Sequence, residues 1–172
     1  MVKKQEVKNY TVQEFYNRIL YKLMQSIGIK HDQPRSIIQE KMYIIYKLGF
    51  ENFGDWHNFS GSIASKGLNE WLIEYLEHTD YLECDYSDLK FKRNVTSVIN
   101  KFNYLMEAQP KTMYDNMWVE LLCQILWYNG TKELLALNKD ITKHKKVIPP
   151  YMRYYTSEIT TAENTLREWN LL

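Results

Sequence analysis

The sequence predicts a mainly α-helical domain with a winged-helix-like core and one small β-hairpin. Three observations lead to this fold class. Apolar residues recur every three or four positions through most of the chain, which is the spacing of helices with one buried face. Glycine or proline interrupts this pattern where helices are expected to end. One short stretch, residues 81–92, instead alternates apolar and polar residues, as strands do.

The first expected helix follows a polar, lysine-containing lead-in, residues 1–10, which we expect to be flexible. Thr11 and Glu14 have the spacing of a capping box at its start. Gly28 is placed to end it. The stripe expected to face the core consists of Val12, Phe15, Ile19, Leu23 and Ile27.

The second expected helix runs from Pro34 to Gly49. Proline suits the first helical position, because the N–H that it lacks would have no partner there. The apolar stripe of this helix is wide, so we expect neighbouring elements on two sides. The stripe contains Ile37, Ile38, Met42, Ile44, Ile45 and Leu48.

A long aromatic connector, residues 50–68, follows the second helix. Connectors longer than about a dozen residues are uncommon and often functional. Its rings must be buried or meet a partner, and the sequence leaves both options open. Residues 61–67 resemble a phosphate-binding loop only superficially, because no strand precedes them and the Gly-Lys-Ser/Thr order is absent. Helix capping by Ser62 and Ser65 is the favoured interpretation.

The third expected helix is followed by the predicted hairpin, at about residues 81–92. The apolar side of this helix is marked by Leu68, Trp71, Leu72, Tyr75 and Leu76, and its solvent side by Glu70, Glu74 and Glu77. Three helices followed by a hairpin are consistent with a winged-helix-like core that carries a helical C-terminal half. A plain helical bundle is the alternative.

The C-terminal half should be helical throughout. Asn94 is placed to cap a fourth helix, and Pro110 follows its end. Residues 117–128 are hydrophobic on nearly all sides, so we expect them to form the central buried helix. Further helices are expected after Thr131 and from Ser157 onward, and the C-terminal leucine pair should dock on the core.

Length and charge restrict the class of protein. A chain of 172 residues fits one domain, residues 1–172, with a core that needs no disulfides. The net charge of +1 does not indicate a polycation that seeks phosphate. With two cysteines, no signal-peptide pattern and no apolar run long enough to span a bilayer, we expect a cytoplasmic protein that does not enter membranes.

The sequence contains no recognisable catalytic or metal-binding signature. His78, Asp80, Glu83 and Cys84 are close together but lack the paired spacing of zinc ligands. No pair of carboxylates lies in apolar sequence in a way that suggests a raised pKa, and no serine lies in a nucleophile elbow. We therefore expect no enzyme activity, no cofactor and no metal site.

Nucleic-acid binding would follow from a winged-helix fold, in which the helix before the hairpin enters the major groove. Here that helix carries Glu70, Glu74 and Glu77, whose carboxylates would repel phosphates. An acidic face of this kind suits a basic protein partner better. One basic stretch elsewhere in the chain remains open as a nucleic-acid contact, and it contains Lys139, Lys143, His144, Lys145 and Lys146.

Four stretches carry a resemblance to one protein family: Ile38-Gln39-Glu40-Lys41-Met42-Tyr43-Ile44, Phe59-Ser60-Gly61-Ser62-Ile63-Ala64, Trp118-Val119-Glu120-Leu121-Leu122, and a final helix with Ala162, Leu166, Leu171 and Leu172. They are similar to patterns of the Panacea (SocA-like) antitoxin domain and the related YwgA-like proteins of bacteria, archaea and phages. The corresponding family patterns are L-Q-K-x-x-Y-x, Y-G-P-Y/V-S, W-x-E-L-L and A-x-x-x-L-x-x-x-x-L-L. The first stretch is shifted by one residue, and Ser62 replaces the proline of the second pattern. The resemblance covers about residues 34–172.

This resemblance implies a protein-binding module without catalysis. Panacea domains neutralise unrelated toxins by direct contact, and related domains act as adaptors for proteolysis or in phage and mobile-element defence. We therefore expect a protein partner, either a toxin or a host or phage factor. The residues expected to contact it are Trp56, His57 and Phe59 of the aromatic connector and Glu70, Glu74 and Glu77 of the third helix. The alternative is a winged-helix regulator that binds nucleic acid.

Overall fold

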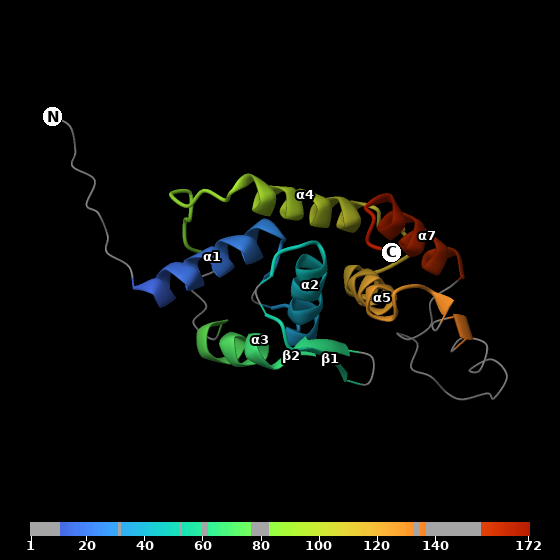
Figure 1. Cartoon of the computed structure of the whole chain (residues 1–172), viewed down its shortest axis with the longest axis horizontal. Coiled ribbons are helices and arrows are strands. Elements are labelled where there is room, and N and C mark those ends of the chain that lie inside the picture. The colour runs from blue at the N-terminus through green and yellow to red at the C-terminus, as the bar shows by residue number, and fades with distance from the viewer. Residues whose placement is uncertain are drawn as a thin grey trace.

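Helices form most of the chain in the structure, a computed structural model that describes residues 11–30, 32–51, 53–59, 62–76, 83–132, 135–136 and 156–172. The elements are α1 (Val12–Ser26), α2 (Arg35–Lys47), β1 (Trp56–Phe59), β2 (Ser62–Ser65), α3 (Lys66–Trp71), the π-helix η1 (Leu72–Leu76), α4 (Arg93–Glu107), α5 (Asp115–Tyr128) and α7 (Thr156–Glu168). In Figure 1, α2 lies at the centre, α4 along the upper side, the hairpin and α3 along the lower side, and α5 and α7 to the right. The predicted class, mainly helical with one small hairpin, is confirmed.

Helix α1 begins with the predicted capping box but does not bury its whole predicted stripe. The Thr11 backbone N–H donates to Glu14 Oε2 at 2.7 Å, and the Glu14 N–H donates to Thr11 Oγ1 at 3.2 Å. Gly28 ends the helix with φ +67°. Val12 is 90% exposed and Phe15 48% exposed, because the first turns of α1 extend beyond the core (Figure 1). The buried side chains lie further along, at Leu20, Tyr21, Leu23, Met24 and Ile27.

Helix α2 is the central element of the fold. Every residue from Ile37 to Ile45 is buried, including the polar Gln39, Glu40 and Lys41. The helix contacts α3, α4, α5 and β2, so the wide apolar stripe does have neighbours on more than one side, as predicted. Pro34 lies one residue before the helix, and Gly49 follows its end with φ +104°.

The hairpin that the structure describes lies within the aromatic connector, at residues 56–65, and not at the predicted residues 81–92. β1 and β2 pair antiparallel, with the register Trp56↔Ser65, His57↔Ala64, Asn58↔Ile63 and Phe59↔Ser62. The hairpin therefore precedes α3, whereas the predicted winged-helix order places it after the third helix. Residues 81 and 82 lie outside the described residues.

Residues 83–92 form turns without a strand because polar side chains of α1 bind them instead. Lys22 Nζ donates to the carbonyl oxygens of Tyr86, at 2.8 Å, and of Leu89. Gln25 Nε2 donates to the carbonyl oxygen of Cys84 at 3.0 Å, and Arg18 forms an ion pair with Asp88 at 2.8 Å. These long side chains occupy carbonyl groups that a partner strand would otherwise need.

The predicted central helix is confirmed in α5, where every residue from 118 to 126 except the half-buried Glu120 is buried and Cys123 is a core residue. Asn129, in the left-handed conformation with φ 53°, ends α5. Helices α4 and α7 pack their apolar sides against the core, and Leu171 and Leu172 pack there too, as expected. Most of the helix expected after Thr131 lies outside the described residues, as do Lys139 to Lys146. None of the helices in the described ranges combines the length and apolar character needed to cross a membrane.

Two alanine substitutions on α1 test where its buried face begins. Leu20 is fully buried, so Leu20→Ala should lower the free energy of unfolding by about 2–5 kcal/mol. Val12 is exposed, so the matched Val12→Ala should change it by less than about 0.5 kcal/mol. Urea denaturation followed by circular dichroism measures both. A loss at Val12 as large as that at Leu20 would show that the first turn of α1 is packed.

Candidate functional site

Two neighbouring polar side chains of α2 hold the hairpin. Gln39 Oε1 accepts a hydrogen bond from the Ser65 backbone N–H at 2.8 Å. The Glu40 carboxyl accepts from Ser62 Oγ at 3.3 Å and from the Ile63 backbone N–H. Ile63 and Ser65 are two positions apart on β2, so their N–H groups point the same way, away from β1. Helix α2 therefore binds the strand edge where a third strand would otherwise pair.

Glu40 is the most perturbed carboxyl group of this junction. Its residue is 2% exposed, and its Oε2 atom is buried without a hydrogen-bond partner in the described chain. Burial, reinforced by the like charge of Glu120 on α5, raises the pKa of Glu40 to about 8. The Cys123 thiol of α5 donates to the Glu40 carbonyl oxygen at 3.2 Å. Glu40 is thus a mostly protonated acid at neutral pH where α2, β2 and α5 meet.

Glu40 was not among the candidate functional residues predicted from the sequence. A usable signal was present, because Ile37 and Ile44 lie three positions before and four positions after it, on the same face of the helix. A carboxyl group between two core isoleucines is expected to be buried. Glu120 was not recognised as its neighbour, because the two residues belong to helices far apart in the chain.

The N-terminus of α3 is occupied by a side-chain cap, as the capping interpretation predicts for Ser65. Ser65 Oγ accepts from the Leu68 N–H at 3.2 Å and lies 2.5 Å from Asp55 Oδ1. Asp55 Oδ2 accepts from the Gly67 N–H at 3.2 Å. The Ser65 hydrogen bond holds the pKa of Asp55 below its usual range. Because the chain's own carboxylate takes the N–H of Gly67, this helix start is not open to a phosphate. Ser62 binds Glu40 instead of capping α3.

The aromatic connector is partly buried. Trp56 is 9% exposed and packs against Tyr43 and Tyr46 of α2, with ring centroids 5.3 and 6.0 Å apart. Tyr43 in turn contacts Trp127 of α5 at 6.0 Å. Trp56 therefore joins the hairpin to the core and has little surface to offer a partner. His57 is exposed on β1.

The acidic side of the third helix is exposed where it is described. Glu70 of α3 and Glu74 of η1 are exposed, and Ile73 next to them is 43% exposed. Of the other residues expected to bind a partner, Glu77 and the side chain of Phe59 lie outside what the structure describes. Glu70 and Glu74 are thus on one outer face, together with the apolar Ile73, which was not among the predicted contact residues.

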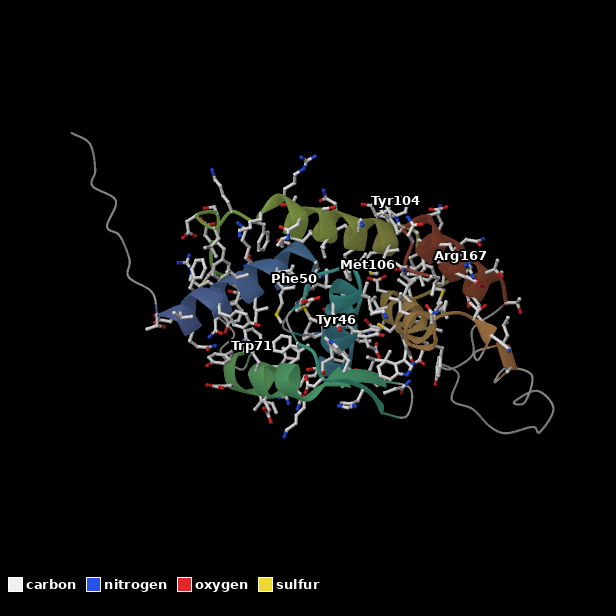
Figure 2. All side chains as sticks on the ribbon, in the orientation of Figure 1. Tyr46, Phe50, Trp71, Tyr104, Met106 and Arg167 are labelled. Carbon is white, nitrogen blue, oxygen red and sulfur yellow. The ribbon has the colours of Figure 1, made fainter. Side chains whose placement is uncertain are left out.

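The inner side of α3 and η1 is fixed to α1. Trp71 Nε1 donates to Asn17 Oδ1 at 3.0 Å, and the Trp71 ring lies 5.2 Å from that of Tyr21. Tyr21 also donates its hydroxyl to the Tyr75 carbonyl oxygen at 3.3 Å. Figure 2 shows Trp71 between α3 and α1. The outer face of this helix is therefore presented on a rigid support.

No group of three or more potential metal ligands occurs in the part of the chain that the structure describes. His78 and Asp80, which lack the spacing of zinc ligands, lie outside that part, and Cys84 is exposed. Comparison with protein-family models, with curated proteins and with solved structures finds no match to this chain.

The pKa of Glu40 predicts a pH dependence of stability. The folded protein keeps the Glu40 proton up to about pH 8, whereas the unfolded chain loses it near the ordinary value of 4.5. The free energy of unfolding should therefore fall as pH rises between these values and level off above the higher one. A tenfold difference in proton affinity corresponds to about 1.4 kcal/mol, so the total loss from this group is on the order of 5 kcal/mol.

The variant Glu40→Gln should lack the pH-dependent loss of stability that comes from Glu40. It should therefore be more stable than the parent protein at pH 8. Urea denaturation at several pH values gives the free energy of unfolding of both proteins. The difference between them, plotted against pH, isolates Glu40, because the other titrating groups contribute equally to both proteins. The control is Glu74→Gln, which alters an exposed carboxyl and should keep the parent profile. Parallel profiles for the parent and Glu40→Gln would mean that Glu40 is ionised in the folded protein.

Proposed function

We propose that this chain is a non-catalytic, protein-binding regulatory module, antitoxin-like or a phage or mobile-element interaction factor, that neutralises or adapts a partner protein by direct contact. The observation that carries the proposal is the outer face of α3 and η1. There Glu70, Ile73 and Glu74 are exposed together on a helix whose inner side is fixed to α1.

The helical geometry of this face supports a binding role. Residues 72–76 form a π-helical turn, a rare geometry that occurs frequently at functional sites. The turn carries both the exposed Ile73 and Glu74. An apolar side chain beside carboxylates matches a partner surface that combines apolar and basic groups.

The arrangement of the quoted motifs also supports the proposal. Gln39 and Glu40 of the first stretch bind Ser62, Ile63 and Ser65 in and next to the second stretch. Glu120 of the third stretch lies close enough to Glu40 to raise its pKa. Stretches that resemble a Panacea-like domain therefore meet at one junction. This is expected if the stretches belong to one structural core, as the resemblance implies.

Of the two predicted contact residues of the hairpin whose side chains are described, one is exposed and the other is buried. His57 is exposed and remains a proposed contact residue. Trp56 is buried, so we assign it to support of the hairpin on α2. The proposed contact surface is accordingly Glu70, Ile73 and Glu74, with His57 as a further contact.

Charge reversal tests the proposed surface. The partner is first sought in the product of the adjacent gene, by co-purification and mass spectrometry, and its affinity is then measured by calorimetry at low and high salt. The double variant Glu70→Lys/Glu74→Lys should weaken binding by about tenfold or more at low salt and by less at high salt, because salt screens exposed charges.

The matched control is Glu51→Lys/Glu107→Lys, which reverses two exposed carboxylates elsewhere on the molecule. It should bind the partner as the parent protein does. Unchanged binding by the α3–η1 variant would exclude this face. Equal weakening by both variants would indicate a response to net charge only.

A further inference from the structure

A second surface, on the other side of the molecule, has a different chemistry. Helix α4 and the end of α7 border an open cleft of about 500 Å³. The cleft is lined by Arg93, Thr96, Ser97, Asn100, Lys101, Tyr104 and Trp169. In Figure 1, α4 and α3 lie on opposite sides of α2, so this cleft is separate from the proposed partner surface.

The chain around this cleft is basic. Residues 89–106 contain Lys90, Lys92, Arg93 and Lys101 and no aspartate or glutamate. Lys90, Lys92 and Arg93 are exposed at the start of α4. Between Arg93 and Lys101 the outer face carries only hydroxyl and amide side chains. This combination of cations and neutral hydrogen-bonding groups is the one that proteins direct at phosphate and sugar groups.

Two aromatic rings close one end of the cleft. Tyr104 is 43% exposed and meets the Trp169 ring edge to face, with centroids 5.1 Å apart. Lys101 Nζ lies 5.7 Å from the Trp169 ring centre. Trp169 Nε1 is buried and has no hydrogen-bond partner among the described residues. Tyr104 thus offers a ring on which a nucleobase can stack.

We propose that this cleft binds a short stretch of single-stranded nucleic acid. Arg93 and Lys101 contact phosphates, the side chains between them bond to the sugar–phosphate backbone, and a base stacks on Tyr104. The helix rises about 1.5 Å per residue, so the distance from Arg93 to Tyr104 is about 16 Å, enough for a few nucleotides. A single strand is favoured over a duplex because stacking on a side chain requires a base that is not already stacked in a helix.

One carboxylate limits the length of this site. Tyr104 donates its hydroxyl to Glu168 Oε2 at 3.2 Å, which fixes the ring at the end of the cleft. The Glu168 charge would repel a phosphate placed beyond Tyr104. The strand therefore extends from Tyr104 toward Arg93, where Lys90 and Lys92 continue the positive charge.

The test is fluorescence anisotropy of the full chain with a labelled oligothymidine of about 20 nucleotides, titrated at several salt concentrations. Binding should weaken steadily with salt, as counterion release requires. The variant Arg93→Glu/Lys101→Glu should weaken binding by about tenfold or more and reduce the salt dependence. Tyr104→Ala should weaken it by about tenfold, and Tyr104→Phe should retain it.

The control variant is Lys66→Glu, which reverses one positive charge on α3, away from the cleft, as each of the two substitutions in the cleft does. Lys66 and the Glu70 carboxylate with which it pairs at 3.7 Å are both exposed, so loss of this pair should cost little stability and the variant should fold. It should bind as the parent protein does.

Three outcomes would overturn the proposal. The first is no binding by the parent protein at low salt. The second is undiminished binding by the Arg93/Lys101 variant, which would place the strand elsewhere, for example on residues 139–146. The third is equal affinity for heparin and for duplex DNA together with no effect of Tyr104→Ala, which would mean attraction of any polyanion.

Discussion

The hydrogen bonds from the edge of β2 to the side chains of Gln39 and Glu40 determine how the rest of the fold is arranged. They satisfy two backbone N–H groups of the strand edge. They also give Gln39 and Glu40 polar partners in the buried middle of α2, where the third polar residue, Lys41, donates to the Gly28 carbonyl oxygen instead. The same strand ends at Ser65, whose hydroxyl caps α3, so the direction of α3 follows from this junction. Helix α5 then covers α2 and places Glu120 near the buried carboxyl.

Features fixed by local chemistry could be predicted from the sequence, and features that depend on distant partners could not. The Thr11–Glu14 capping box, the end of α1 at Gly28 and the burial of α5 follow from residues close together in the chain, and all three are confirmed. The hairpin was placed wrongly, because alternation at residues 83–92 cannot reveal that Lys22 and Gln25 occupy carbonyl groups there. Val12 continues the apolar stripe of α1, and no local signal shows that the core ends before it.

The candidate surfaces also divide into features that local sequence determines and features that depend on distant residues. Exposure of Glu70 and Glu74 could be predicted from helical spacing, whereas the burial of Trp56 depends on Tyr43 and Tyr46 of another element. A net charge of +1 conceals a separation of charge, with exposed carboxylates on α3 and η1 and cations along α4. An average over the chain cannot reveal surfaces of opposite sign. The net charge of the whole chain therefore did not reveal that one face is acidic and another is basic.

The contiguity of α2, the hairpin and α3 in the chain has a consequence for how the protein forms. Their mutual contacts join residues 35–71, so little loop-closure entropy opposes them, and we expect this unit to assemble early. Helix α5, which covers α2, begins only at Asp115 and leaves the ribosome much later. Until then the apolar side of α2 that faces α5 has no cover. The nascent chain therefore passes through a stage in which its future core is exposed and prone to aggregation.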